Sequence, residues 1–195
     1  MEITLILRHS EREKLTSPEQ APRAGLTLKG KLKALRQGLY VSGHAGNLHS
    51  TYTSPVKRCI DTASLMHTSM LARGIRPQFY SSEMLGNGYI DESQFEKWRH
   101  FMIFNSEWSS YSRLFRLWEK RGWLKLTLQD YGEALLKEFL QECNVLAVTH
   151  DCNIGPLFEF LSKKYGFGVT SDMICLLYTS PSPRDRTRSR MPSSA

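Results

Sequence analysis

The segments ITLILRHS (residues 3–10) and VLAVTHD (residues 145–151) decide the fold that we expect for this chain. Each begins with a short apolar run, rich in β-branched residues, that ends at polar residues, a pattern typical of a buried strand. The first run leads into His9 and the second into His150. Because ligands bind beyond the carboxyl ends of strands in open α/β sheets, we expect the two histidines to meet in one site.

The sequence between these segments alternates between strand-like and helix-like patterns. Strands are predicted over 2–8, 50–53, 77–82 and 145–149, and helices over 28–41, 55–72, 129–142 and 154–165. Strands that alternate with helices indicate right-handed βαβ units and a mainly parallel sheet. We therefore predict an α/β protein in three layers, α/β/α, with helices on both faces of the sheet.

Small polar residues mark the expected starts of three helices. Thr27 is predicted to cap the first helix, and Asn153 the last one. Ser54 and Pro55 are expected to be the N-cap and the first helical residue of the second. Four leucines repeat along one side of the first helix and are predicted to be its core face: Leu28, Leu32, Leu35 and Leu39.

Residues 84–125 are predicted to form a helical cap inserted into the sheet domain. Within them, residues 92–125 hold all four tryptophans, interleaved with arginines. Such a segment suits either an aromatic cluster that packs on itself or a surface on which bases stack. The first interpretation is favoured.

Length and composition are typical of one globular domain, with 195 residues of which 41% are hydrophobic. No apolar run approaches the roughly 20 residues that span a bilayer. The N-terminal apolar stretch is too short for a signal peptide and has no basic region before it, so we expect a cytoplasmic protein. The four cysteines show no paired spacing, which favours free thiols in a reducing compartment.

The last twenty residues differ in composition from the rest of the chain. Residues 176–195 are rich in Ser, Pro and Arg, and four arginines against one aspartate supply much of the formal net charge of +7. We interpret them as a disordered basic tail or as translated adapter sequence, which leaves residues 1–175 as the folded domain. Because the rest of the chain then carries an unremarkable net charge of +4, no nucleic-acid partner is expected.

Arginines lie where a phosphoryl group would bind at the predicted strand ends. Arg8 precedes His9, Arg12 follows three residues later, and Arg58 lies in the first turn of a helix, whose N–H groups also favour an anion. The planar guanidinium can bind two phosphate oxygens at once. The chain has no Walker-type loop and no acidic cluster, so we predict phosphoryl chemistry without a metal ion or other cofactor.

The histidines suit two different roles in such a site. Neighbouring arginines lower the pKa of His9, and a neutral imidazole can attack phosphorus to form a phosphohistidine. His150 could donate to the transferring oxygens. Asp151 could protonate the leaving oxygen and then activate the hydrolytic water.

Four segments carry a resemblance to a known family. They are LILRHSER (5–12), LTLKGKLKALRQGL (26–39), YTSPVKRCIDTA (52–63) and VTHDCNIGPL (148–157). In this order the chain resembles the histidine phosphatase superfamily, and the His-Asp pair followed by Asn153 is similar to its acid-phosphatase branch. The resemblance covers roughly residues 1–170 and implies a phosphoglycerate mutase-like fold.

The resemblance also implies a role for each residue at the matching positions. His9 would be the nucleophile, Asp151 the proton donor, and the phosphate pocket would consist of Arg8, Arg12, Arg58 and His150. The chain departs from the family at Ser10, where glycine is usual, and that side chain could crowd the pocket or add a donor. Glu83 remains a rival acid, because the mutase-like branch uses a glutamate from a comparable region.

The expected activity is metal-independent hydrolysis of phosphomonoesters through a phosphohistidine on His9. Two alternatives remain: a phosphoglycerate mutase-like phosphotransferase and a catalytically weak module that binds phospho-ligands. The expected partner is a phosphorylated small-molecule substrate. Neither a nucleic acid nor a membrane is expected as a partner.

Overall fold

The computed structural model describes residues 4–15, 17–44, 47–104, 111–139 and 144–166. The predicted tail, 176–195, lies outside these residues, as do Trp108, Cys143 and Cys175. Among the helices that the structure describes, none has the length and apolar character needed to cross a membrane.

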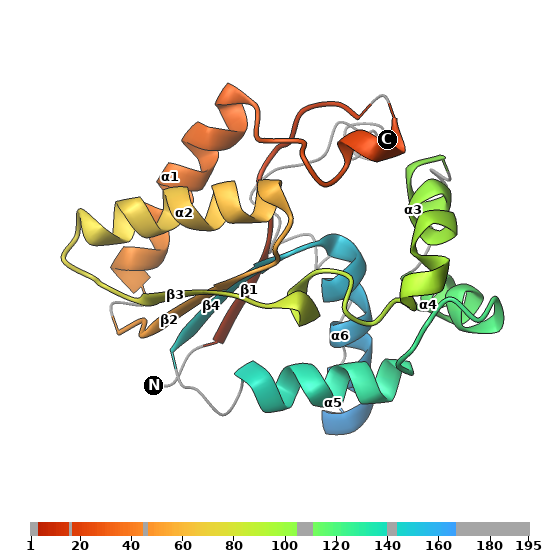
Figure 1. Ribbon diagram of the computed structural model, residues 1–195. Coiled ribbons are helices and arrows are strands. Elements are labelled where there is room, and N and C mark those ends of the chain that lie inside the picture. Colours follow the sequence, from red (N-terminus) through yellow and green to blue (C-terminus); the bar gives the residue numbers. More distant parts are fainter. Residues whose placement is uncertain (1–3, 16, 45–46, 105–110, 140–143, 167–195) are drawn as a thin grey trace, which may run out of the picture.

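The described strands form one parallel sheet. They are β1 (Thr4–Arg8), β2 (Ser50–Thr53), β3 (Gln78–Ser81) and β4 (Val145–Thr149). Their order is β1-β4-β2-β3, and every pairing is parallel (Figure 1). Because β4 lies between β1 and β2, the segments that follow β1 and β4 leave the sheet side by side. The prediction of a parallel sheet is confirmed.

Helices cover both faces of this sheet, as predicted for three layers (Figure 1). One layer holds α1 (Leu28–His44) and α2 (Lys57–Leu71), and the other holds α5 (Leu128–Phe139) and α6 (Asp151–Tyr165). Side chains of the fully buried strand β4 alternate between the two cores: Leu146 and Val148 join one, Val145 and Ala147 the other. This two-sided burial explains the uninterrupted apolar run in the sequence.

The prediction for the core face of α1 is wrong. Leu28, Leu32 and Leu39 are 76%, 55% and 40% exposed. The helix instead packs against α2 through small residues, because the two backbones approach closely. A Cβ added to Gly38 would lie 2.5 Å from the Met66 carbonyl oxygen. Leucines cannot fit such a contact, so their side of the helix faces away from it.

One predicted helix start is confirmed and two are wrong. The backbone N–H of Gly30 donates to the Thr27 hydroxyl, which caps α1 as expected. The N-cap of α2 is Val56, two residues after Ser54. The last helix begins at Asp151 with His150 as its N-cap, so Asn153 lies inside the first turn. These shifts release the Ser54 and Asn153 side chains for other contacts.

The predicted cap segment is helical and packs on itself. It contains η2 (Glu83–Leu85), η3 (Glu92–Gln94), α3 (Phe95–Phe104) and α4 (Tyr111–Lys120). Trp118 is fully buried, 5.8 Å from the Trp98 ring and 6.0 Å from the Phe115 ring. Tyr89 and Tyr131 extend the same cluster to α5. A buried aromatic core of this kind leaves these rings no face on which bases could stack.

Candidate active site

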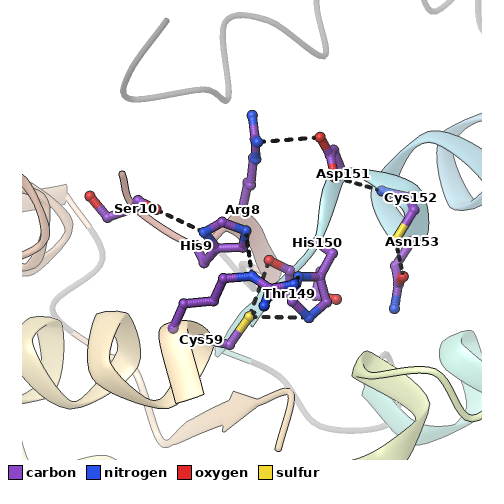
Figure 2. Close-up of polar contacts among 10 residues, drawn as sticks. Arg8, His9, Ser10, Cys59, Thr149, His150, Asp151, Cys152 and Asn153 are labelled. Carbon is purple, nitrogen blue, oxygen red and sulfur yellow. Dashed lines mark hydrogen bonds and ion pairs between the residues drawn. The ribbon is translucent and has the colours of Figure 1, made fainter. Parts of the chain in front are cut away.

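The carboxyl ends of three strands meet at the candidate site. The His9 N–H donates to the Thr149 carbonyl at 2.9 Å, and the Ser54 N–H donates to the Val148 carbonyl at 3.0 Å. The imidazole rings of His9 and His150 lie with centroids 5.3 Å apart and planes inclined by 66°. Figure 2 shows the two rings in the same cluster of polar side chains. The central expectation from the sequence, that the two histidines meet, is confirmed.

The hydrogen bonds of His9 define which of its nitrogens carries the proton. Nδ1 lies 2.8 Å from the Ser10 carbonyl oxygen, which can only accept, so Nδ1 is the protonated nitrogen. Nε2 then carries a lone pair, and it accepts a hydrogen bond from Arg58 Nε at 3.1 Å. The ring is 7% exposed. A lone pair on Nε2 is what a nucleophilic histidine requires.

Arg58 links the two histidines. It is the second residue of α2, so its place in the first turn is as predicted. Its Nη2 lies 3.2 Å from His150 Nδ1, and its Nη1 donates to the Ala21 carbonyl at 2.7 Å. The guanidinium therefore lies between the two rings, with its orientation fixed by the loop that follows β1.

Both histidines are held neutral. Burial lowers the pKa of His9 well below its ordinary value, and the positive charges of Arg58 and Arg8 lower it further. Burial and the same arginines also lower the pKa of His150, which is 4% exposed. The arginines that would bind an anion therefore also keep the imidazoles unprotonated, as the sequence predicted for His9.

Asp151 lies at the same edge of the sheet. Its Oδ2 is 3.4 Å from Arg8 Nη2, and its Oδ1 accepts from the Cys152 N–H (Figure 2). Both side chains of the ion pair are one-quarter exposed, which places them at the mouth of the site. Glu83, the rival acid, has an exposed side chain at the start of η2. The placement of the two carboxylates favours Asp151.

The structure orients Ser10 away from the site. Its hydroxyl donates to the Gly30 carbonyl at 2.8 Å, and its N–H donates to the Thr62 hydroxyl at 3.0 Å. The side chain is thus turned toward α1, and neither crowding nor an added donor in the pocket follows from it. Arg12 donates to the Glu13 carbonyl, and its charge contributes to the lowered pKa of His150. A phosphate contact of Arg12 stays a prediction.

Asn153 joins α6 to the loop after β3. Its amide nitrogen donates to the carbonyls of Leu85 and Gly86 at 3.0 and 2.8 Å, and its oxygen accepts from the Tyr89 hydroxyl. This role was missed, because the sequence alone suggested only a cap. The contacts fix the N-terminal turn of α6, and with it the position of Asp151.

Cys59 was not singled out by sequence reasoning, yet it lies against His150. It is fully buried in α2, with Sγ 3.5 Å from His150 Nε2. Cys59 and Cys152 are both free, as expected for these two thiols. Burial raises the pKa of each to about 12, so both stay protonated. In the described part of the chain, no three His, Cys, Asp or Glu side chains form a group that could hold a metal ion.

Comparison with known proteins finds similarity in structure alone. No protein-family model matches the sequence, and no curated protein matches it.

Several solved structures of phosphatases match the fold. Phosphoserine phosphatase from Entamoeba histolytica, solved in complex with 3-phosphoglyceric acid, is 14% identical over 86% of this chain and 85% of its own, with a TM-score of 0.51. Mycobacterial hydrolase 2 is 17% identical over 81% of this chain and 71% of its own, with a TM-score of 0.50. Mycobacterial glucosyl-3-phosphoglycerate phosphatase is 17% identical over 84% and 80%, with a TM-score of 0.49.

The first two matches establish the fold. The chain has the α/β fold of these phosphatases, in agreement with the phosphoglycerate mutase-like fold that the four sequence segments implied.

Proposed function

We propose that this protein is a phosphatase that hydrolyses phosphomonoesters through a phosphohistidine on His9. The observation that carries the proposal is the tautomer of His9. Its Nδ1–H is bound to the Ser10 carbonyl, and its Nε2 lone pair points at the Arg58 guanidinium, within the arginine-rich edge of the sheet. A neutral, oriented imidazole beside an anion-binding group is the arrangement that nucleophilic attack on phosphorus needs.

In the first step, phosphate oxygens replace the two histidines as acceptors of the Arg58 hydrogen bonds. Arg8 likewise exchanges its ion pair with Asp151 for the phosphate. His9 Nε2 then attacks phosphorus in line with the ester bond. The P–N bond forms while the P–O bond to the leaving group breaks, and Asp151 delivers a proton to the leaving oxygen.

In the second step, water hydrolyses the phosphohistidine. Asp151, now a carboxylate, accepts a proton from the attacking water. The P–N bond breaks, inorganic phosphate leaves, and the electron pair returns to Nε2 of His9. The Ser10 carbonyl stays bound to Nδ1–H throughout, which keeps the ring in one orientation and stabilises positive charge on the phosphorylated imidazole.

The proposed substrate class is a phosphorylated small molecule. The Entamoeba phosphatase with the same fold was solved with 3-phosphoglyceric acid, which supports a phosphomonoester of this size. The position of Asp151 beside Arg8 supports hydrolysis rather than mutase chemistry on Glu83. The orientation of Ser10 toward Gly30 removes the main structural reason for expecting a weak binding module.

The test is hydrolysis of p-nitrophenyl phosphate by the wild-type chain and by His9→Ala, with and without a chelator. We expect turnover by the wild type that the chelator leaves unchanged, and no turnover by the variant. His49→Ala, which replaces an exposed histidine without a proposed role, is the matched control. Retained turnover in His9→Ala would contradict the proposal.

A further inference from the structure

A row of buried polar groups extends from His150 on the side opposite Arg58, and the proposed mechanism does not use it. The Ser54 hydroxyl oxygen lies 3.2 Å from His150 Nε2. The Cys59 Sγ lies 3.5 Å from the same His150 Nε2 and 3.5 Å from the Thr149 carbonyl oxygen. Ser54 and Cys59 are both fully buried. Such groups lie out of reach of substrate, so their role must be exerted through His150.

The obligatory donor on one side of His150 fixes where its proton lies. A guanidinium can only donate, so Arg58 donates to His150 Nδ1. A carbonyl can only accept, so the Cys59 S–H donates to Thr149. A neutral His150 that accepts at Nδ1 has its hydrogen at the other ring nitrogen, where the Ser54 oxygen and Cys59 Sγ are the acceptors. The proton of His150 is therefore on Nε2, and its lone pair is on Nδ1.

The protonation states of the chain members agree with these directions. Burial raises the pKa of Cys59 to about 12, so the thiol keeps the proton that it donates to Thr149. The Val56 N–H also donates to the Ser54 oxygen, at 3.3 Å. If the Ser54 hydroxyl turned to donate to His150 instead, its oxygen would lose His150 Nε2–H as a donor and keep only the Val56 N–H.

We propose that Ser54 and Cys59 are positioning residues that hold His150 as its Nε2–H tautomer, so that phosphate binds at Nδ1 with a proton between them. This rests on the proposed phosphatase function. When Arg58 turns to the phosphate, the Nδ1 lone pair would face a bare phosphate oxygen and repel it. A phosphate monoanion removes the repulsion: its O–H bond breaks, an N–H bond forms at Nδ1, and a phosphate dianion remains beside an imidazolium.

Other charged or titratable groups also face His150. They come from the end of β1, the loop after it, α2 and α6: Arg8, His9, Arg12, Arg58, Cys59 and Asp151. The arginines attract every charge state of phosphate and so cannot by themselves require a proton. Asp151 is present in every variant below, so a difference between those variants reports on His150.

The experiment measures the His150 tautomer by ¹⁵N NMR in the full chain, and proton uptake on binding inorganic phosphate by calorimetry in two buffers. We expect the Nε2–H tautomer in the wild type. At a pH above the second pKa of phosphate, binding should take up close to one proton per phosphate. Ser54→Ala should shift the tautomer equilibrium roughly fivefold to tenfold toward Nδ1–H, the effect of one lost hydrogen bond, and lower the uptake. Ser54→Thr, which keeps the hydroxyl, should restore both.

Cys59→Ala should produce a smaller shift in the same direction, and it keeps the test decisive if Ser54→Ala does not fold. Cys152→Ala is the matched control, because that buried thiol is bound to Asn153 instead. An Nδ1–H tautomer in the wild type would overturn the inference, and so would a tautomer unchanged in Ser54→Ala and Cys59→Ala. Phosphohistidine formation is a separate readout: if it fails while the tautomer holds, the proposed function is wrong and only the positioning by Ser54 and Cys59 survives.

Discussion

Arg58 Nε lies 3.1 Å from Nε2 of His9, the nitrogen that we propose as the nucleophile. The same guanidinium reaches Nδ1 of His150 at 3.2 Å. In this structure one cation therefore occupies the hydrogen-bonding positions of both histidines. A phosphate group that draws the guanidinium onto its own oxygens would free Nε2 for attack in the same movement. Arg58 thus joins phosphate binding to exposure of the nucleophile.

Arg58→Ala is predicted to lower kcat by roughly 10²-fold to 10³-fold, because it removes a preorganised donor to the transferring oxygens. It should also raise the pKa of His9, since the Arg58 charge is one of the causes that lower it. Burial remains the largest cause, so this pKa should stay below its ordinary value. Histidine titration by NMR measures the shift, and an unchanged His9 titration would contradict the assigned contact.

Asp151→Asn is predicted to slow hydrolysis by roughly 10²-fold to 10⁴-fold for alkyl phosphates, whose leaving oxygen needs a proton. The loss should be much smaller for p-nitrophenyl phosphate, which has a good leaving group. Comparing the two substrates in steady-state kinetics checks the role. Glu83→Gln is the matched control and should leave both rates unchanged. A larger loss in Glu83→Gln than in Asp151→Asn would assign the acid to Glu83.

Folding stability is predicted to fall at acid pH because of the two buried histidines. Both have lowered pKa values in the folded chain, whereas the unfolded chain takes up protons near the ordinary value of about 6.5. Below that pH the unfolded state therefore binds more protons than the folded state. The free energy of unfolding should decrease by up to about 1.4 kcal/mol per pH unit for each histidine.

Urea unfolding at a series of pH values measures this slope. In the double variant His9→Gln/His150→Gln the slope below about pH 6.5 should become shallower. His44→Gln, at an exposed position, serves as the control. Equal slopes in the wild type and the double variant would show that the two histidines are not buried in the neutral form.

The packing of α1 predicts that replacing a helical glycine by alanine destabilises the fold, although alanine usually stabilises a helix. Gly38→Ala should destabilise the fold by about 1–3 kcal/mol, because the new Cβ would meet the Met66 carbonyl oxygen at 2.5 Å. In an exposed helix the same change would stabilise by up to about 1 kcal/mol. Leu32→Ser, on the exposed face, should change stability little. Urea unfolding of the two variants checks which face is buried.

Much of the fold followed from patterns in the sequence. The run VLAVT predicted β4 because a strand buried on both faces needs apolar residues at every position. The ends of β1 and β4 then brought His9 and His150 together, because adjacent parallel strands end at the same edge of the sheet. The position of Arg58 in the first turn of a helix was predicted correctly, because a helix start is a local feature.

The errors arose where tertiary contacts override local patterns. Leu28 and Leu32 repeat at helical spacing, yet the close approach of α1 to α2 selects the side that carries Gly38. Asn153 has the chemistry of a cap, but its amide is used by the distant carbonyls of Leu85 and Gly86. Spacing along the chain carries no information about such long-range partners.

The buried chain through Ser54 and Cys59 could not be predicted for the same reason. The sequence indicates that Ser54 precedes a helix and that Cys59 follows Arg58. It does not show that both side chains turn toward His150, which lies more than 90 positions away in the sequence. The pairing of β2 with β4 and the packing of α2 against β4 bring these groups together.

The measurement that tests the account most directly is trapping of the phosphoenzyme. The full chain is mixed with a ³²P-labelled phosphomonoester and quenched in alkali, in which phosphohistidine survives, and the labelled peptide is identified. The account predicts acid-labile, alkali-stable phosphate on His9, absent from His9→Ala and longer-lived in Asp151→Asn, which lacks the base that activates water. Turnover without a label on His9, or a label on another residue, would contradict it.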